Sequence, residues 1–403
     1  MKILIASDTY LPLVSGNVIV VDQTARELAK RGHKVFLVVP GTEIETKIKK
    51  PQKNLTVFYT RGFKNPLRVN SYLPLAGTSI WKFMRQVKPD VIHIHTPGPV
   101  GLIARRYGTW YQVPQIITVH GMPDFLASYL KLDVDLVKSS FNEIGWAFWR
   151  FILKPAAMVI APAQFVANQL VKVGVKNKIE VVPFWIEIDW QLLEKLKKSP
   201  PPSCQLRQKN KLTFLYYGRL DTDKSIKLLI KAWAKSALAR QQAQLLLVGT
   251  SKEKPALEAL AKKLHVSDSI KFLGMVPDAT YRQLGFKPEK KDCVMELIFD
   301  QADFFVIPSN IETQSITTYL AILFGLPVIG SSKGALPEAI QKTPYPELVF
   351  QADSVADLTK KIDLVIKKRA YYKKYQPADK LKRYYDKNEI LNKLERVYTR
   401  VSQ

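Results

Sequence analysis

Polar side chains gather where an apolar strand gives way to a helix in the second half of this sequence. The apolar run at 304–307 is followed by Glu312, and Thr313, Gln314 and Ser315 then open an expected helix. In open α/β sheets, ligands bind at the carboxyl ends of the strands. The unpaired N–H groups and the positive dipole end of a helix start attract phosphate. The segment therefore predicts a ligand site that combines a carboxylate with an affinity for phosphate.

A second group of candidate residues lies earlier in the same half. Arg219 follows the expected strand at 212–217, and Lys224 stands five residues later, where a helix begins. An arginine offers a planar fork and a lysine a compact point charge, a combination that suits a diphosphate. Such a pair is usually surface decoration when it stands alone. Its position upstream of Glu312 makes the binding interpretation the stronger one.

The first half contributes a loop and a set of histidines. The loop at 7–17 has Gly16 as its only glycine, so it lacks the Gly-x-Gly-x-x-Gly fingerprint of classical dinucleotide sites. His120 ends an expected strand, with Asp124 nearby, and His93 and His95 share one face of an upstream strand. No matching third ligand is evident, so we expect no metal site.

Strands and helices alternate through both halves, which predicts two α/β domains with parallel sheets. A Pro-rich stretch at 196–210 indicates a linker between a first domain at 1–195 and a second at 211–380. Expected strands lie at 2–7, 34–39, 55–59, 91–95, 115–119, 158–161, 179–182, 212–217, 244–248, 270–273, 304–307, 327–329 and 348–350. A helix at 18–31 is expected to end at Gly32.

Composition narrows the class of protein. The chain has 403 residues, 47% of them hydrophobic, which is typical of a globular protein with two full cores. No secretory signal or membrane-spanning run is visible, and Cys204 and Cys293 are expected to be reduced thiols, so we expect a cytoplasmic protein. The net charge of +26 favours anionic partners. We rank an anionic membrane above nucleic acid because no nucleic-acid motif accompanies the charge.

These segments together resemble the donor-site motifs of the family 4 glycosyltransferases of the GT-B fold. The resemblance implies two Rossmann-like domains that face a central cleft, with a final helix, 381–403, that crosses back to the first domain. It assigns catalysis to His120 and Glu312, and it places His95 and Asp124 on the acceptor side. Donor binding would then involve Gly16, Arg219, Lys224, Val276, Thr313, Gln314, Ser315 and Leu320.

The family's chemistry, carried over by the same resemblance, is the transfer of a hexosyl group from a nucleotide-diphosphate sugar with retention of configuration. It needs no metal and no cofactor, and the donor would be UDP-glucose or GDP-mannose. One position departs from the pattern, since the family has a second glutamate where this chain has Leu320. A leucine cannot accept the ribose hydrogen bonds of that glutamate. A degenerate, non-catalytic GT-B protein that acts as a binding or partner subunit therefore stays open as an alternative.

The sequence around Glu312 looks most like that of lipid-directed members, such as diacylglycerol glucosyltransferases and phosphatidylinositol mannosyltransferases. The helical region at 134–153 carries two apolar stripes. We expect Ile144 and Phe148 to belong to a core stripe. Trp146 and Trp149 belong to the second stripe, which either dips into a lipid interface or is also buried. A lipid or glycan acceptor and a peripheral location at the inner face of the cell membrane follow as expectations. The sequence specifies no oligomeric state.

Overall fold

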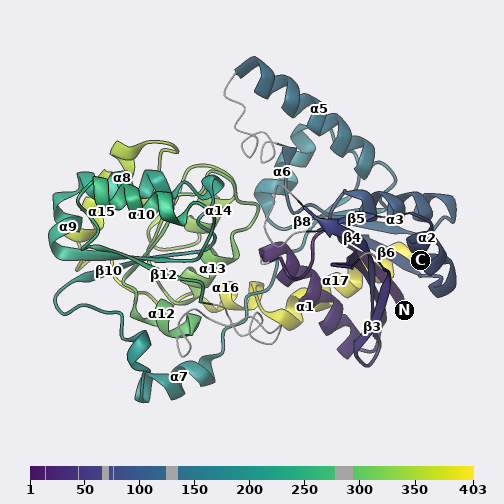
Figure 1. The fold of residues 1–403 in the computed structure, drawn as a ribbon, viewed down its shortest axis with the longest axis horizontal. Coiled ribbons are helices and arrows are strands. Elements are labelled where there is room, and N and C mark those ends of the chain that lie inside the picture. The colour runs from purple at the N-terminus through teal and green to yellow at the C-terminus, as the bar shows by residue number, and fades with distance from the viewer. Residues whose placement is uncertain (14, 44, 66–71, 76, 124–134, 277–293) are drawn as a thin grey trace. The chain divides into compact units, whose positions relative to one another are not determined.

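The computed structural model describes the chain except residues 14, 44, 66–71, 76, 124–134 and 277–293, and it leaves out the side chains of 135–141 and 203. The described chain divides into two compact units (Figure 1). Unit 1 comprises Met1–Phe184 together with Lys387–Gln403, and unit 2 comprises Trp185–Asp386.

Unit 1 is built on a sheet whose central strands are parallel, as the alternating pattern predicts. The strand order is β3 (Lys47–Gln52), β4 (Leu55–Lys64), β2 (Lys34–Pro40), β1 (Lys2–Ala6), β6 (Val91–Ile94), β7 (Gln115–Thr118), β8 (Met158–Ala161) and β9 (Ile179–Val181), and β5 (Tyr72–Leu75) pairs with β4. The antiparallel strands β3 and β5 were not expected. Strand β3 is polar and mostly exposed at a sheet edge, so it has no apolar pattern to reveal it.

Helices cover both faces of this sheet. Those of unit 1 are α1 (Gly16–Lys30), α2 (Thr78–Val87), α3 (Pro99–Trp110), α5 (Asp135–Leu153), α6 (Gln164–Lys172) and α17 (Lys387–Ser402). Leu4 and Ala6 belong to the apolar cluster formed with α2, α3, α5 and α6. Because side chains alternate along a strand, Ile3 and Ile5 point to the other face, where α1 and α17 pack against the sheet. Figure 1 shows α1 and α17 side by side within unit 1.

Unit 2 contains a fully parallel sheet whose expected strands are all confirmed within about two residues. The order is β12 (Ile270–Gly274), β11 (Ala243–Val248), β10 (Leu212–Tyr217), β13 (Phe304–Ile307), β14 (Val328–Ser331) and β15 (Val349–Phe350). Its helices are α7 (Trp190–Lys198), α8 (Ile226–Lys235), α9 (Ala237–Gln242), α10 (Lys254–Lys263), α12 (Met295–Gln301), α13 (Ile316–Leu323), α14 (Leu336–Ile340), α15 (Val355–Lys367) and α16 (Asp379–Tyr384), with 3-10 turns at Pro202–Cys204, Thr222–Lys224 and Pro346–Leu348.

The boundary between the units differs from the predicted one. The chain enters unit 2 at Trp185, and the segment 196–210 belongs to that unit instead of forming a free linker. Leu193, Cys204 and Leu206 are buried in the apolar core of unit 2, so the Pro-rich stretch is held by packing on either side of it. Helix α16 also stays in unit 2, and the return to unit 1 begins at Lys387, not at 381.

Three further expectations concern the cysteines, membrane spans and the first helix. Cys204 is disulfide-bonded, which corrects the expectation of a reduced thiol; Cys293 lies outside the described residues. No described helix has both the length and the apolar character needed to cross a bilayer. Helix α1 confirms the predicted helix: its C-cap is Arg31, and Gly32 follows with a φ of +93°.

Candidate active site

The predicted phosphate-binding residues of unit 2 form one cluster of charged groups. Strands β10 and β13 are neighbours in the sheet, so the loops that follow their carboxyl ends meet. Lys224 Nζ lies 2.8 Å from Glu312 Oε1 and 3.4 Å from Asp223 Oδ2. Arg219 lies 3.3 Å from Asp223 through Nη2 and also pairs with Asp221. We call Arg219, Asp221, Asp223, Lys224 and Glu312 the ion cluster.

Lys224 stays charged within the ion cluster. Burial by itself would lower the pKa of Lys224, but the carboxylates of Glu312 and Asp223 outweigh it and raise that pKa. The side chains of Lys224 and Glu312 are only 16% and 13% exposed, so water screens their attraction weakly. A cation held in place at the end of a parallel sheet is suited to an anionic ligand group.

The backbone takes an unusual conformation at the start of both helices that begin beside the ion cluster. Ser225 caps α8 with φ 53° and ψ 34°, and Ser315 caps α13 with φ 61° and ψ 77°, both in the left-handed region that favours glycine. The left-handed turn at Ser315 delays α13, which begins at Ile316, after the predicted start at Thr313. The hydroxyl of Ser315 lies 2.7 Å from that of Thr318, inside the first turn of α13.

A neighbouring loop supports Glu312 from behind. Ala335 N donates to Glu312 O at 2.9 Å. Gly334 has a φ of +65°, and a Cβ at that position would lie 2.6 Å from Glu312 O and 2.8 Å from Glu312 N. Only glycine fits such a close approach, so Gly334 and the loop before α14 set the backbone position of Glu312.

The other predicted donor residues are placed in different surroundings. Gln314 and Val276 are buried, and the carbonyl of Val276 accepts a hydrogen bond from the hydroxyl of Tyr217. Leu320 is 4% exposed and belongs to the apolar core of unit 2. Gly16 begins α1 in unit 1 and is not part of the ion cluster.

The predicted histidines of unit 1 come together at the ends of β6 and β7. His95 Nδ1 lies 2.7 Å from His120 Nε2, and the ring of His120 stacks on Phe184 with centroids 5.0 Å apart. The rings of His93 and His95 are 4.2 Å apart. We call His93, His95 and His120 the histidine cluster. The shared strand face predicted for His93 and His95 is confirmed, and the packing onto His120 follows from the pairing of β6 with β7.

The histidine cluster is electrically neutral. Burial lowers the pKa of all three rings, to about 3 for His95 and well below the usual value for His93 and His120. The neighbouring rings add to the effect at His93 and His120. None of the three can act as a cation near neutral pH. In the described part of the chain, no cluster of three or more His, Cys, Asp or Glu side chains is arranged to hold a metal.

Two further candidate residues, Asp223 and Asp8, were not apparent from the sequence. Asp223 stands between Arg219 and Lys224 and contacts both, a role that its position in the same loop could have suggested. Asp8 accepts hydrogen bonds from Gly98 N, Val100 N and Gly101 N at 2.9, 2.7 and 3.3 Å, and so occupies the start of α3. Burial raises the pKa of Asp8, and these hydrogen bonds oppose that rise. No local sequence signal connects Asp8 to α3, because 90 residues separate it from Gly98.

Helix α5 contradicts the core assignment of Ile144 and Phe148 and agrees with the buried alternative for Trp146 and Trp149. Trp146 and Trp149 are each 8% exposed and lie in the core, whereas Ile144 and Phe148 are 71% and 43% exposed. Helical spacing alone identifies two stripes but cannot say which one faces the sheet. Asp124, the remaining residue predicted for the acceptor side, lies outside the described residues.

The two parallel-sheet units have the GT-B fold of glycosyltransferases. The chain matches the family descriptions "Glycosyltransferase Family 4" over residues 14–190 and "Glycosyl transferases group 1" over residues 204–382. The chain therefore belongs to glycosyltransferase family 4, as the motifs at Arg219 and Glu312 predicted.

Similar proteins include the alpha-monoglucosyldiacylglycerol synthases of Acholeplasma laidlawii and Streptococcus pneumoniae. The first is 25% identical over 82% of this chain and 80% of its own length, and the second 24% identical over 88% and 77%. Among solved structures, Anabaena HepE in complex with UDP-glucose superposes with a TM-score of 0.71 at 16% identity, covering 99% of this chain and 100% of HepE. That structural likeness concerns the fold.

Proposed function

We propose that this protein transfers a hexosyl group, with retention of configuration, from a nucleotide-diphosphate sugar to a membrane lipid of the diacylglycerol or phosphatidylinositol type, or to a glycan. The observation that carries the proposal is the 2.8 Å contact between Lys224 and Glu312 beside Arg219, at the carboxyl ends of β10 and β13. These residues provide phosphate-binding cations and a carboxylate for the sugar within one cluster.

In this mechanism, the bond between the anomeric carbon and the diphosphate oxygen breaks. The acceptor oxygen forms its new bond on the same face of the sugar, and its proton passes to the departing diphosphate. Arg219 and Lys224 stabilise the negative charge that develops on the leaving group, aided by the N–H groups at the start of α13. Glu312 stabilises the positive charge that develops on the sugar. The reaction uses neither a metal nor a cofactor.

UDP-glucose and GDP-mannose are the proposed donors, and the UDP-glucose complex of HepE supports the first of them. Thr313, Gln314, Ser315 and Val276 would complete the donor site. Leu320 would leave the ribose without the carboxylate contact that the family's second glutamate provides. Leu320→Glu tests this placement: nucleotide affinity should change, with circular dichroism to confirm that the buried substitution is tolerated. An unchanged affinity in a folded variant would show that Leu320 does not line the ribose site.

The main experiment incubates the protein with labelled UDP-glucose or GDP-mannose, a lipid extract and EDTA. A labelled glycolipid with the donor's anomeric configuration is expected, by NMR of the product. Absence of product and of donor hydrolysis with either nucleotide sugar would contradict the proposal. A product with inverted configuration would contradict only the proposed retention. Loss of activity in EDTA would contradict only the proposal that the reaction needs no metal.

A non-catalytic GT-B subunit is the second candidate, favoured by Leu320 at the position of the family's second glutamate. Calorimetry with UDP-glucose and GDP-mannose separates the two. Tight binding without turnover in the presence of lipid extract supports the subunit role, and turnover excludes it.

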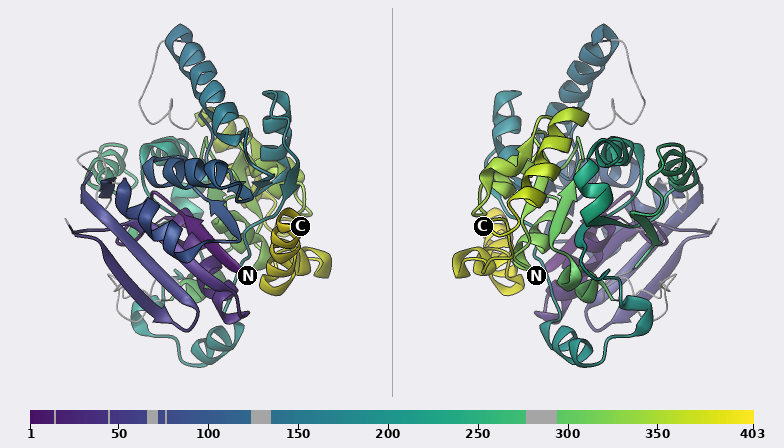
Figure 2. Two further views of the ribbon diagram at one scale, coloured as in Figure 1. Left: turned by 90° about the vertical axis from the view of Figure 1, so that its right-hand side faces the viewer. Right: turned by 90° about the vertical axis from the view of Figure 1, so that its left-hand side faces the viewer.

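An anionic membrane is the proposed location of the acceptor, and an exposed face of unit 1 supports it. Ile144, Phe148 and Phe151 are spaced by four and three residues on α5 and are 71%, 43% and 57% exposed. Figure 2 shows α5 projecting from the body of unit 1. The guanidinium of Arg105 lies 4.3 Å from the ring centre of Phe151, so a basic group borders the apolar stripe.

Further basic and aromatic side chains are exposed on α3 and at the end of α5. Arg106 is exposed on α3, near the 71% exposed Trp110, and Arg150 and Lys154 are exposed at the end of α5. None of these three basic residues has an ion-pair partner in the described part of the chain. Apolar groups that insert beside basic groups match an anionic bilayer, where each basic residue contributes about 1 kcal/mol. We therefore propose peripheral binding at the inner face of the cell membrane.

Vesicle sedimentation tests the proposed membrane face. The protein should bind vesicles of phosphatidylcholine with phosphatidylglycerol more strongly than phosphatidylcholine alone. The affinity of the double variant Phe148→Ser/Phe151→Ser for these vesicles should be at least about tenfold lower. The control is Ile48→Ser, an exposed position on the edge strand β3, which should bind as the wild type does. Equal vesicle binding by the wild type and the double variant would contradict this assignment. So would a wild-type protein that is dimeric in solution together with a double variant that is monomeric, because the apolar stripe would then be a dimer interface.

A further inference from the structure

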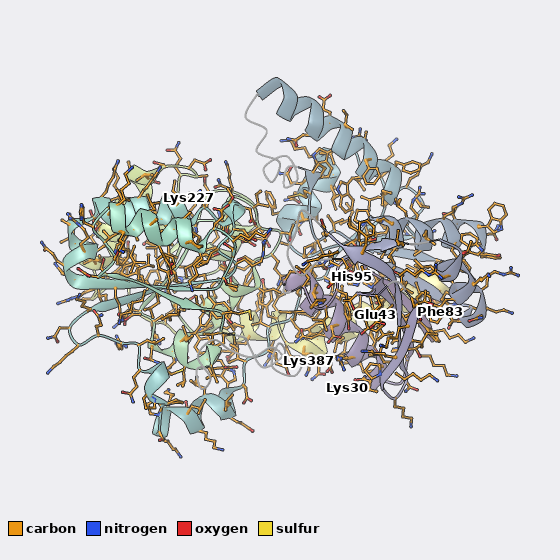
Figure 3. The ribbon with its side chains drawn as sticks, viewed as in Figure 1. Lys30, Glu43, Phe83, His95, Lys227 and Lys387 are labelled. Atoms are coloured by element: carbon orange, nitrogen blue, oxygen red, sulfur yellow. The ribbon has the colours of Figure 1, made fainter. Side chains whose placement is uncertain are left out.

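A chain of buried polar contacts joins the last helix of the protein to His120. Tyr398 lies on α17, and its hydroxyl is 2.7 Å from His93 Nδ1. The other ring nitrogen of His93 lies 2.7 Å from Thr118 Oγ1 on β7. His93 packs on His95, and His95 contacts His120. Figure 3 labels His95 within unit 1, which contains the whole chain of contacts.

We propose that Tyr398, His93 and His95 are positioning residues that fix the ring orientation and the tautomer of His120. The inference rests on the proposed function only in so far as His120 is assumed to contact the substrate. Its geometry stands on unit 1 alone.

The rings of His93 and His120 are each restrained in more than one direction by their neighbours. His93 is hydrogen-bonded at both nitrogens, by groups from α17 and β7, and Tyr398 also meets its face edge-on with centroids 5.7 Å apart. His95 is therefore packed against a ring that cannot turn. His120 is held in its plane by His95 and on its face by Phe184, with only 12° between the stacked rings.

The proposal assigns a direction to each hydrogen bond of His93. Burial raises the pKa of Tyr398, so its hydroxyl keeps its proton and can donate to His93 Nδ1. In the proposed arrangement Tyr398 is the donor, so His93 carries its proton on Nε2 and donates it to Thr118 Oγ1. Burial of the cluster keeps the imidazoles neutral, so each has one donor and one acceptor nitrogen.

The same count assigns the contact between His95 and His120. His95 Nε2 is buried and makes no hydrogen bond to any described atom. An unpaired buried N–H group is rarer than an unpaired acceptor, so the proton of His95 lies on Nδ1 and is donated to His120 Nε2. His120 consequently carries its own proton on Nδ1. In this arrangement His120 is a neutral imidazole, and not an imidazolium.

The fold explains why the last helix takes part. Residues two apart on a strand share a face, so His93 and His95 on one strand and Thr118 and His120 on the next all line the face on which α17 packs. Deletion or displacement of α17 would therefore alter His120 without touching it. The chain separation of 305 residues between His93 and Tyr398 hides this connection from the sequence.

The first test is a tautomer measurement that needs no activity. The chain has five histidines, so ¹⁵N-histidine labelling gives a resolvable NMR spectrum. We expect the Nδ1–H tautomer at His120 and the Nε2–H tautomer at His93. Finding the Nε2–H tautomer at His120 in the wild type would overturn the proposal, whatever the protein transfers.

The second test compares matched variants. Tyr398→Phe keeps the ring and removes the hydroxyl, and should lower kcat about three- to tenfold with an unchanged donor KM. Tyr107→Phe is its control, because Tyr107 is also buried in unit 1 and its hydroxyl donates to Met84 O at 3.1 Å, away from the histidines. Equal kinetics for the two variants would overturn the role of Tyr398.

His95 allows a rescue experiment. The amide of an asparagine can replace the Nδ1–H donor of a histidine, whereas an alanine cannot. His95→Ala should lose about tenfold in kcat and give a mixture of tautomers at His120, and His95→Asn should restore most of both. If His95→Asn and His95→Ala behave alike while both remain folded, His95 does not position His120.

Discussion

The histidine cluster of unit 1 and the ion cluster of unit 2 are built on opposite electrostatic principles. His93 and His95 are almost fully buried and His120 is partly buried, and burial lowers the pKa of all three rings. The ion cluster keeps its charges, because Asp223 and Glu312 compensate the burial of Lys224. Both clusters lie at the carboxyl ends of parallel strands. The same position in the fold thus supports a neutral hydrogen-bonding group in one unit and a charged group in the other.

The difference has a structural cause. The histidines are surrounded by rings and by hydroxyl groups, which orient a neutral imidazole but do not stabilise a charge. The ion cluster pairs every cation with carboxylates and sits beside two helix starts that carry serines in the left-handed conformation. Geometry is therefore maintained by packing in unit 1 and by ion pairs and strained turns in unit 2.

The largest effect is expected from removing charge in unit 2. Lys224→Met should lower kcat/KM by about a hundredfold or more, since a cation aimed at the leaving group is lost. It should also lower the melting temperature, because Glu312 keeps a half-buried charge without its partner. Steady-state kinetics and calorimetry measure both effects. Lys227→Met is the control: Lys227 is three residues further along, 53% exposed and 3.6 Å from Glu253, and its loss should change neither value appreciably.

Acid should weaken unit 1 through the histidine cluster. A histidine whose folded pKa is lowered adds stability that is complete above its unfolded pKa of about 6.5 and is lost as the pH falls towards the folded pKa. The folded pKa of His95 is about 3. Protonation of this residue in the unfolded state should therefore lower the unfolding free energy by about 2 kcal/mol when the pH is reduced from 7.5 to 5.

Urea unfolding of the wild type and of His95→Asn at both pH values isolates this contribution. The difference between the two pH values should be smaller in the variant by about 2 kcal/mol. Asp8, whose pKa burial raises, acts in the opposite direction but is common to both proteins. An identical pH dependence in the two proteins would mean that folding does not lower the pKa of His95.

A smaller but specific effect is expected at Gly334. Gly334→Ala should destabilise unit 2 by about 1–3 kcal/mol and displace Glu312, because the new Cβ would overlap the Glu312 backbone. Gly174→Ala separates strain from overlap, since Gly174 has a φ of +82° and nothing within 4 Å of the added Cβ. The melting temperature and the donor affinity should fall more for Gly334→Ala than for Gly174→Ala. Equal losses in the two variants would contradict the proposal that Gly334 sets the position of Glu312.

The smallest effect is expected at the cap of α8. Ser225→Gly relieves a left-handed serine that makes no capping hydrogen bond and should stabilise the protein by about 0.5 kcal/mol, after the entropic cost of glycine. Asn210→Gly, at φ 62°, should gain less because asparagine tolerates that conformation better. Melting temperatures of the two variants test the strain, and a lower value for Ser225→Gly would contradict it.

The sequence predicted most of the strands, the three histidines of unit 1, and Arg219, Lys224 and Glu312 of the ion cluster, but not its two aspartates, Asp221 and Asp223. Strands such as 304–307 and 212–217 are buried on both faces and form continuous apolar runs, so they were recognised directly. Strand β3, the packed segment at 196–210 and the stripe orientation of α5 were missed. Each of these depends on the surface against which the segment packs, which a local pattern does not contain.

The order of residues alone determined the pair of α/β domains, the family, and the strand ends at which Arg219, Glu312 and His120 occur, because these depend on apolar periodicity and local motifs. Tertiary structure decided the partners: Lys224 with Glu312, Gly334 behind Glu312, and Tyr398 behind the histidines. Such contacts join positions far apart in the chain. They arise from which strands are neighbours and which helix covers a face, and no single segment of sequence encodes either.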